Sequence, residues 1–357
     1  MFVTRKFPPS VGGMETLAAG VWRSLSADRA DSVLISHGGP NRDLVWWLPV
    51  SAVRLLVLLV RGGAGTVLTG DALTYVVMAP VARLARRPCA TMVMGLDVTY
   101  PNPLYRAVVR PLLRRAPLVI AISRETAERA REVGVAAGRI AVVRLGVAPP
   151  PAGPGRPAPG AGGDGAHPDL PGVPARAVVL LTLGRLVRRK GVRWFAGEVL
   201  PHLPPEVHYA VAGEGPERHA IEEAAAEAGV AGRVHLLGRV DDEARERLLR
   251  RADLFVQPNI PVAGDMEGFG LVTVEAALRA TPVVAADLEG IRDAVVDGQT
   301  GYLLPAGDAA AWIGRLGGLV GDRAGLAAVG RSFAVRAAEL FDEQQMGRAL
   351  AELLGRL

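Results

Sequence analysis

The most informative stretch of the sequence reads Asp265-Met266-Glu267-Gly268-Phe269-Gly270-Leu271-Val272-Thr273-Val274-Glu275-Ala276-Ala277. It follows an apolar run typical of a strand, and it begins a helical pattern that we predict over Leu271–Arg279. Gly268 and Gly270 allow the backbone to approach a ligand closely. The N–H groups and the dipole of the first helical turn favour an anion. The stretch therefore predicts a strand, a loop and a helix that together bind a diphosphate.

Two carboxylates accompany this predicted anion site. Glu267 precedes the helix, and Glu275 lies about one turn inside it with its side chain leaning back toward the N-terminus. A carboxylate beside a diphosphate is unfavourable unless it accepts hydrogen bonds from hydroxyls, which a sugar ring and a ribose supply. The alternative is an acidic first turn that only caps the helix. Both glutamates together with the two glycines favour the sugar-nucleotide interpretation.

Three further turns follow predicted strands or begin predicted helices. Leu183–Gly191 contains Arg185 and Lys190, which we expect on the diphosphate, since arginine binds it bidentately and lysine acts as a mobile point charge. A solvated basic turn is the alternative there. Ala212–Glu217 and Val11–Glu15 are glycine turns before helices, and each alone is weak evidence for a ligand site.

Apolar runs alternate with helical patterns along the rest of the chain. The predicted strands are 32–35, 66–69, 90–94, 118–122, 140–143, 177–183, 207–212, 234–237, 254–257 and 282–286. The predicted helices include 15–27, 124–133, 194–200, 217–228, 242–251 and 271–279, and a last helical stretch covers about 326–357. This alternation predicts an α/β fold of two doubly wound, Rossmann-like domains facing across a cleft, with ligands at the carboxyl ends of the strands.

The predicted boundary between the domains is a segment rich in proline and glycine. Of the 26 residues from Pro149 to Pro174, nine are proline and seven are glycine, a composition that argues against helix or sheet. We predict domains at 1–148 and 176–330, a linker at 149–175, and a C-terminal helix at 331–357.

The amino-acid composition excludes several kinds of site. The chain has 357 residues, half of them hydrophobic, and a single cysteine, Cys89, so a disulfide framework and a cysteine zinc site are excluded and a reducing, cytoplasmic compartment is expected. No Asp-x-Asp pair is present and the six histidines are scattered, so neither a metal nor another cofactor is expected. His37 is interpreted as a loop residue rather than a catalyst.

Charge is distributed unevenly between the two halves. Residues 1–146 contain 19 basic and 9 acidic residues, whereas residues 147–357 contain 22 and 27. The first half should therefore attract anions. Finger, homeodomain-like and RRM-like motifs are lacking, so we expect no nucleic acid. A phosphorylated small acceptor or an anionic membrane surface fits better. The apolar segment 44–61 is expected to be a buried helix, with Pro49 and Arg54 arguing against a membrane span; contact with a membrane or a lipid acceptor is the alternative.

Together these segments resemble the GT-B glycosyltransferases, and specifically the retaining family 4, which includes phosphatidylinositol mannosyltransferases. The resemblance extends over nearly the whole chain. Its most specific part is the pair Glu267 and Glu275 around Gly268-Phe269-Gly270, followed by Pro282-Val283-Val284-Ala285, Glu289-Gly290-Ile291, Asp297-Gly298 and Thr300-Gly301-Tyr302. The turn Gly12-Gly13-Met14-Glu15 and the segment from Gly184-Arg185 to Lys190-Gly191 also match.

The resemblance implies roles for individual residues. Arg185, Lys190 and Glu267 would be catalytic, the two cations stabilising the departing nucleotide and the glutamate orienting the donor sugar. The residues implied to bind the donor are Gly13, Gly184, Arg239, Val240, Gly268, Phe269, Gly270, Leu271 and Glu275. Among them, Glu275 would bind the ribose, and Arg239 and Val240 would contact the nucleotide base. Gly13 would approach the diphosphate from the other domain. Residues implied to line the acceptor side are Gly12, Met94, Gly95 and Asp97. The C-terminal helix would pack on the N-terminal domain.

Two positions depart from the family pattern. Met94 stands where the family usually has a histidine, in the segment Met94-Gly95-Leu96-Asp97, and methionine cannot replace the hydrogen bonds of an imidazole. One hypothesis is a donor that lacks an ordinary 6-hydroxyl, such as a 6-deoxysugar or a pentose; the other is a repacked acceptor pocket. Ala280 replaces a frequent glycine, which we expect to be a minor packing change.

The sequence thus predicts a glycosyltransferase that moves a sugar from a nucleotide-diphosphate donor to a hydroxyl or amine. The acceptor would be a small molecule, a natural product or a lipid. The resemblance implies retention at the anomeric carbon and a front-face mechanism without metal. Two alternatives stay open, a sugar-nucleotide epimerase on the same fold and a non-catalytic sugar-nucleotide binder. Only an acceptor-dependent product separates a transferase from both. The base, the sugar, the acceptor and the oligomeric state are left open.

Overall fold

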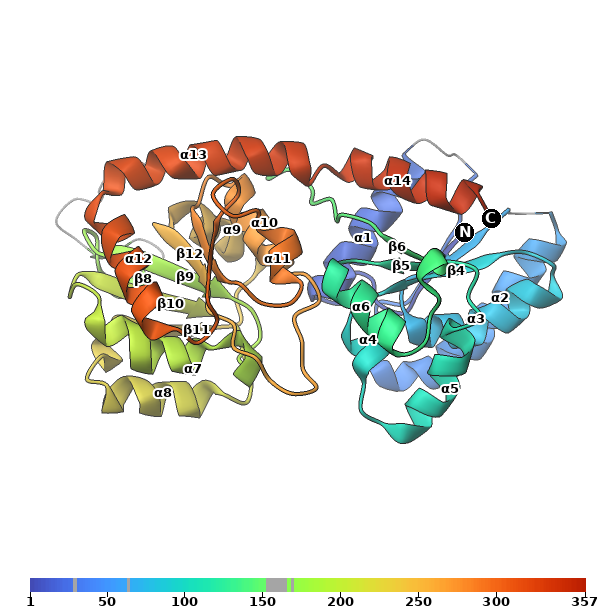
Figure 1. The fold of residues 1–357 in the computed structure, drawn as a ribbon, viewed down its shortest axis with the longest axis horizontal. Helices are drawn as coiled ribbons and strands as arrows, with labels where there is room; N and C mark the ends of the chain where they lie inside the picture. Colours follow the sequence, from blue (N-terminus) through green and yellow to red (C-terminus); the bar gives the residue numbers. More distant parts are fainter. Residues whose placement is uncertain (28–30, 63–64, 152–165, 168–169) are drawn as a thin grey trace. The chain divides into compact units, whose positions relative to one another are not determined.

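The computed structural model describes residues 1–27, 31–62, 65–151, 166–167 and 170–357 of the chain. They form two compact units (Figure 1). The first unit contains Met1–Ala148 together with Phe341–Leu357, and the second contains Pro149–Leu340. The chain therefore passes from one unit to the other at two points.

The first unit is built on a six-stranded parallel sheet. Its strand order is β2-β1-β3-β4-β5-β6. The strands are β1 (Phe2–Thr4), β2 (Leu34–Ser36), β3 (Val67–Thr69), β4 (Cys89–Val93), β5 (Val119–Ala121) and β6 (Ile140–Val142). The apolar side chains of the central strands, such as Val3, Val67 and Val119, are fully buried, as expected for a parallel sheet covered on both faces.

Four helices of the first unit begin at polar side chains that accept the free N–H groups of the first turn. Asp71, Asn102, Ser123 and Asp342 serve in this way. The helices are α1 (Gly13–Ser26), α2 (Leu44–Val60), α3 (Ala72–Leu84), α4 (Leu96–Thr99), α5 (Pro103–Leu113), α6 (Arg124–Glu132) and α14 (Glu343–Gly355), with 3₁₀ turns at Asn41–Asp43 and Ala137–Arg139. The last helix, α14, packs on α1.

The second unit has its own six-stranded parallel sheet, ordered β11-β10-β9-β12-β13-β14. The strands are β9 (Val178–Leu183), β10 (Val207–Ala212), β11 (Val234–Gly238), β12 (Leu254–Gln257), β13 (Val283–Ala286) and β14 (Tyr302–Leu304). Trp312, Phe195 and Tyr209 are fully buried and form the aromatic centre of its core.

Helices cover both faces of this second sheet. Figure 1 shows α7 and α8 on one face and α9, α10 and α13 on the other. The helices are α7 (Val192–Trp194), α8 (Arg218–Glu227), α9 (Asp242–Arg251), α10 (Leu271–Leu278), α11 (Ile291–Ala294), α12 (Ala309–Gly321) and α13 (Arg323–Leu340). A π turn at Phe195–Val199 and a 3₁₀ turn at Leu200–His202 extend α7, and further 3₁₀ turns lie at Arg188–Lys190 and Ala231–Arg233.

Two expectations about the connecting segments are wrong. The predicted linker 149–175 contains a short antiparallel pair, β7 (Ala166–His167) with β8 (Leu170–Pro174). Leu170 and Val173 are each 1% exposed, so these apolar side chains of β8 are buried although the strand contains prolines. The rest of the predicted linker, 152–165 and 168–169, lies outside the described residues.

The predicted C-terminal stretch differs as well. It consists of two helices, and the predicted boundary after residue 330 falls inside α13, which continues to Leu340. The division of units lies between Leu340 and Phe341. Asp342 then starts α14, because its carboxylate accepts the N–H of Gln345 at 2.7 Å.

The strand orders locate the ligand edge of each sheet. Connections run in opposite directions from β1 and from β9, so that β1 neighbours β3 and β9 neighbours β12 at the points where the order reverses. In open α/β sheets, ligands bind outside the carboxyl ends of the strands at such a point. The loops after β1, β3, β9 and β12 are therefore the segments at which this architecture places ligands.

Candidate functional site

In the second unit, a tight turn after β9 lies against the loop that follows β12. The 3₁₀ turn Arg188–Lys190 ends at Gly191, whose φ is +66°. A Cβ at Gly191 would lie 1.8 Å from the carbonyl oxygen of Pro258. Only glycine tolerates both the left-handed backbone and this approach. Gly191 thus lets the basic turn meet the loop that contains Glu267.

The two loops join in a cluster of charges around Glu267. Lys190 Nζ lies 2.6 Å from Glu267 Oε2, and Asn259 Nδ2 donates to the same oxygen at 3.2 Å. Arg189 Nη2 is 3.9 Å away, and Arg189 Nε also pairs with Asp265 at 3.3 Å. Lys190 and Arg189 are each 7% exposed, so the cluster is largely withdrawn from water.

Burial alone would raise the pKa of Glu267, because it penalises the charged form. The charges of Lys190 and Arg189 and the hydrogen bonds from Lys190 and Asn259 overcome that effect and lower the pKa to about 2. Glu267 is therefore ionised throughout the physiological range. It is an acceptor of hydrogen bonds there and not a proton donor.

The backbone of Glu267 is held from the loop after β13. Glu289 Oε2 accepts the N–H of Glu267 at 2.6 Å, and the N–H of Gly290 donates to the Glu267 carbonyl at 3.1 Å. These bonds fix the path of Gly268, Phe269 and Gly270 into the first turn of α10. Phe269 is buried and anchors this turn, while Gly268 is half-buried.

Several buried polar atoms near this turn lack hydrogen-bond partners among the described residues. They are both amide atoms of Gln257, Oδ1 of Asn259 and Nη1 of Arg189. Gln257 is the last residue of β12, and a Cβ at Gly270 would lie 3.2 Å from its Nε2. Buried polar groups are nearly always hydrogen-bonded. Unpaired ones at the start of α10 therefore mark a place completed by water or a ligand.

Glu275 lies inside α10, where the sequence predicted it, and is 6% exposed. Arg245 of α9 donates to its Oε2, so the carboxylate is held by a cation that the sequence analysis did not identify. Leu271 is the first helical residue of α10. After β11, Arg239 is exposed and Val240 is half-buried.

Arg185 occupies a different situation from Lys190. It is exposed and has no ion pair among the residues that the structure describes. Gly184 before it has a φ of +147°, and a Cβ there would lie 3.4 Å from Lys190 Cε. The structure thus brings Lys190, Glu267 and the start of α10 together, and leaves Arg185 and Arg239 on the surface of the same edge.

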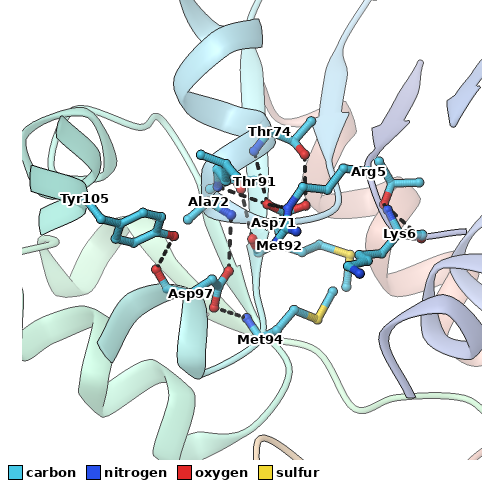
Figure 2. A network of polar contacts seen from close by, with 12 residues as sticks. Arg5, Lys6, Asp71, Ala72, Thr74, Thr91, Met92, Met94, Asp97 and Tyr105 are labelled. Atoms are coloured by element: carbon cyan, nitrogen blue, oxygen red, sulfur yellow. Dashed lines mark hydrogen bonds and ion pairs between the residues drawn. The ribbon is translucent and has the colours of Figure 1, made fainter. Parts of the chain in front are cut away.

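A second polar network lies at the carboxyl edge of the sheet of the first unit (Figure 2). Arg5 follows β1, and its Nε donates to Asp71 Oδ1 at 2.9 Å. Asp71 follows β3 and caps α3. Asp97 follows β4, and its two oxygens accept the N–H groups of Met94 at 2.8 Å and Ala72 at 3.1 Å. The buried acid therefore braces two strand ends rather than presenting its carboxylate to solvent.

Burial raises the pKa of Asp97 to about 6, and the nearby charge of Asp71 adds to the increase. The hydrogen bonds from Ala72 and Met94 and the charge of Arg5 oppose it. Two carboxylates near one arginine cannot both be charged at low cost. This network is consequently sensitive to pH just below neutrality.

The remaining predicted residues of the first unit lie at the same edge. Met94 is 9% exposed, and Gly95 beside it has a φ of +109°. Gly12 and Gly13 lie where α1 begins, and Gly13 is exposed. Below them Glu15 is buried, with Lys6 Nζ 3.4 Å from its Oε1.

Sequence reasoning missed the residues that support these groups. They are Arg5, Lys6, Asp71, Arg189, Arg245, Gln257, Asn259 and, as a backbone anchor, Glu289. Arg189 belongs to the basic run between 185 and 190, but the sequence of that run does not reveal which of its side chains turn inward. Among the described residues, no group of three or more His, Cys, Asp and Glu side chains could hold a metal ion.

Comparison with known proteins places these features in context. Residues 177–322 match the family described as glycosyl transferases group 1. A GDP-mannose-dependent alpha-(1-6)-phosphatidylinositol monomannoside mannosyltransferase of Mycolicibacterium smegmatis is 29% identical, and the alignment covers 99% of this chain and 97% of that protein. A phosphatidyl-myo-inositol mannosyltransferase of Mycobacterium leprae is 37% identical over 40% of this chain. The chain spans only 37% of that relative's length.

Solved structures match the whole chain. A crystal structure of Anabaena HepE in complex with UDP and glucose has a TM-score of 0.74 at 21% identity and covers 100% of this chain and 99% of that one. Sucrose-phosphate synthase from Thermosynechococcus elongatus has a TM-score of 0.77 at 20% identity, with coverage of 99% and 98%. These likenesses establish the GT-B fold that the sequence predicted.

Proposed function

Residues 177–322 are a glycosyl transferases group 1 domain within a GT-B fold, and we propose that the chain is a retaining glycosyltransferase. It would transfer a sugar from a nucleotide-diphosphate donor to a hydroxyl or amine of a small-molecule or lipid-linked acceptor. The observation that carries the proposal is the ion pair of buried Lys190 with Glu267, whose side chain is 13% exposed, beside the first turn of α10. A positive charge and an ionised carboxylate there suit the two halves of a sugar nucleotide, the anionic diphosphate and the hydroxylated sugar.

On the donor side, we assign the diphosphate to Lys190, Arg185 and the N–H groups that begin α10. Positive groups fixed in advance stabilise the charge that develops on the leaving diphosphate. In this proposal they supply the charge that a metal would otherwise supply, so the reaction is metal-independent. Glu267 accepts hydrogen bonds from the donor sugar, and Glu275 accepts them from the ribose.

The proposed reaction takes place on one face of the donor sugar. The acceptor oxygen forms a bond to the anomeric carbon while the bond from that carbon to the diphosphate oxygen breaks. The proton of the acceptor hydroxyl passes to the departing diphosphate. Glu267 is ionised and already paired with Lys190, so it serves to orient the sugar and does not attack it.

Two comparisons suggest the first donors to test. The relative that aligns along 99% of this chain is named as GDP-mannose-dependent, and the HepE structure contains UDP and glucose. Relatives named for phosphatidylinositol substrates support a lipid-linked or phosphorylated acceptor on the first unit. We propose that the protein works in the cytoplasm, in keeping with its single, free cysteine, Cys89.

Thermal unfolding with UDP, GDP, ADP and dTDP, without added metal, tests the donor site. A ligand at a hundred times its Kd adds about 2.7 kcal/mol, which raises Tm by roughly 5–11 °C at about 2–4 °C per kcal/mol. We expect one nucleotide to produce this increase and Arg185→Ala to abolish it. Arg188→Ala is the matched control, since Arg188 is an exposed arginine of the same segment. No increase with any nucleotide would contradict the proposed donor site.

A second measurement separates the transferase from its alternatives. Donor carrying a labelled sugar is incubated with and without candidate acceptors, and the products are separated. A labelled glycoside that forms only with acceptor supports the proposal. Interconversion of donor without acceptor would indicate an epimerase, and tight binding without any product would indicate a sugar-nucleotide binder.

A further inference from the structure

The helix α2 of the first unit has two apolar faces, and only one of them is covered. Leu44, Ser51, Leu55 and Leu59 are buried. Opposite them, at the three- and four-residue spacing that keeps side chains on one helical face, lies an apolar stripe. Its members are Trp46, Val50, Val53, Val57 and Val60, which are between 41% and 76% exposed.

This exposure corrects the expectation of a buried helix. By length and composition Asn41–Val60 could cross a membrane, yet only 22% of its most apolar 18-residue stretch is buried inside the protein. Leu55 and Leu59 belong to the core of the unit, and α2 packs against α3. The helix is therefore held on the surface of the unit with its stripe facing outward. Such a helix suits the plane of a membrane surface better than a span across it.

The charges around the stripe identify the kind of surface. Within α2 itself the only charged residue is Arg54, which is exposed, and exposed Arg42 and Arg61 lie just beyond its two ends. Within the described segment 41–61 the one acidic residue is Asp43, which lies 3.7 Å from Arg42. At the end of the adjoining helix, Leu84 is 75% exposed and is surrounded in sequence by three further arginines. An apolar stripe edged by cations matches an anionic bilayer, which offers apolar chains below negative headgroups.

We propose that the α2 stripe docks this protein on an anionic lipid bilayer. Trp46 lies at the level of the headgroups, where the amphipathic indole is favoured, and the valines reach the boundary with the acyl chains. Arg54 and Arg61 contact lipid phosphates. The inference does not depend on the proposed reaction, because every residue in it lies outside the proposed donor site. It would nonetheless bring a lipid-linked acceptor and the first unit to the same surface.

Vesicle flotation of the full chain tests the proposal. We expect the protein to float with vesicles of equal parts phosphatidylglycerol and phosphatidylcholine, and to float less as salt is raised. Val53→Glu should reduce the partition coefficient at least tenfold, since it places a charge within the stripe. Val335→Glu is the matched control, a valine 63% exposed on α13, and should leave binding unchanged. Arg54→Gln and Arg61→Gln should each reduce binding about fivefold.

The fluorescence of Trp46 reports directly on insertion of the α2 stripe into the bilayer. Lipids with brominated chains should quench its fluorescence, and Trp46→Phe should remove most of the quenching. Failure of the wild-type protein to float, or equal flotation of Val53→Glu, would overturn the proposal. Self-association in the absence of vesicles that Val53→Glu abolishes would also overturn it, and would assign the stripe to a second copy of the chain. An unchanged Tm for Val53→Glu, with a normal nucleotide-induced increase, shows that the variant is folded and keeps the two proposals separate.

Discussion

Replacement of Lys190 by methionine removes the closest charge partner of a buried carboxylate. Lys190 is 7% exposed, and its Nζ lies 2.6 Å from Glu267 Oε2. Methionine fills a similar volume without the charge. In Lys190→Met, Glu267 is left with the distant guanidinium of Arg189 and the amide of Asn259. The variant should therefore unfold more readily at neutral pH.

The magnitude follows from two independent arguments. The surroundings of Glu267 lower its pKa from 4.5 to about 2, and each pKa unit corresponds to about 1.4 kcal/mol, so they favour the ionised form by about 3 kcal/mol. Breaking one partner out of a buried ion pair typically costs about 3–5 kcal/mol. Lys190 is the largest of the favourable contributions to that decrease in pKa, so the first argument sets about 3 kcal/mol as the scale and the second about 3–5 kcal/mol. We expect a loss of about 3 kcal/mol, or a decrease in Tm of roughly 6–12 °C.

The loss of stability in Lys190→Met should grow as the pH rises. In the wild type the folded pKa of Glu267 lies below its ordinary value, so its contribution is complete above about pH 4.5 and is lost as the pH falls toward 2. In Lys190→Met, burial should raise the pKa, so the variant is penalised as the pH rises from 4 to 7. Urea unfolding at pH 5 and pH 7 should show a smaller difference between variant and wild type at the lower pH.

Two companion variants make the test specific. Adding Glu267→Gln to Lys190→Met should restore most of the stability, because the buried charge is then gone, while donor turnover stays lost. Lys6→Met is the matched control, since Lys6 is the other lysine of the chain and its pair with Glu15 is longer, at 3.4 Å. A stability of Lys190→Met within 1 kcal/mol of the wild type at pH 7 would refute the reasoning, as would a failure of the second substitution to restore it.

Three further outcomes are expected. Gly191→Ala should lower the free energy of unfolding by at least about 2 kcal/mol, because its Cβ would lie 1.8 Å from the Pro258 oxygen, whereas Gly229→Ala, with a similar φ of +70° and nothing within 4 Å, should cost less in the same urea titration. The Asp97 carboxyl, whose pKa burial raises to about 6, should reduce the stability of the first unit by about 3 kcal/mol as the pH rises from 4 to 7, and Asp97→Asn should lack this decrease in urea midpoints. If Met94 reflects a donor without a 6-hydroxyl, Met94→His should weaken deoxy-donor binding in thermal-shift titrations; higher turnover of ordinary hexose donors without that weakening would contradict the hypothesis.

The alternation of apolar runs and helical patterns was enough to predict both sheets. Val207–Ala212 and Leu254–Gln257 became strands with those bounds, because fully buried parallel strands are continuous apolar runs. The strands β1 and β14 were missed because their apolar runs, residues 1–3 and 302–304, are only three residues long, whereas the runs that revealed the other three-residue strands extend over four or five residues. The pair β7 and β8 was missed because proline and glycine dominate its composition, and composition does not reveal burial such as that of Leu170.

Residues of the candidate site were predicted where they lie close together in the sequence. They were missed where only folding brings distant residues together. Glu267 and the glycines after it lie within four residues, so their role at a helix start could be inferred. Among the four basic residues between 185 and 190, Arg185 and Lys190 were expected on the diphosphate, but the 3₁₀ turn Arg188–Lys190 buries Arg189 and Lys190 and leaves Arg185 exposed. Asn259 lies eight residues before Glu267 in the same loop, and the return of that loop brings its amide to the Glu267 carboxylate. The approach of the two loops at Gly191 brings Lys190 there as well.

The double passage of the chain between its two units makes the first unit discontinuous in sequence. Its α14 is encoded some two hundred residues after the rest, and Met346 and Leu350 of that helix are buried. A fragment ending at Ala148 would therefore expose the surface of α1 that α14 covers, whereas Pro149–Leu340 is an uninterrupted segment suited to separate expression. A synthetic peptide of residues 341–357 added in trans should complement the shorter fragment. Fragment complementation would thus replace simple truncation as the way to isolate the first unit.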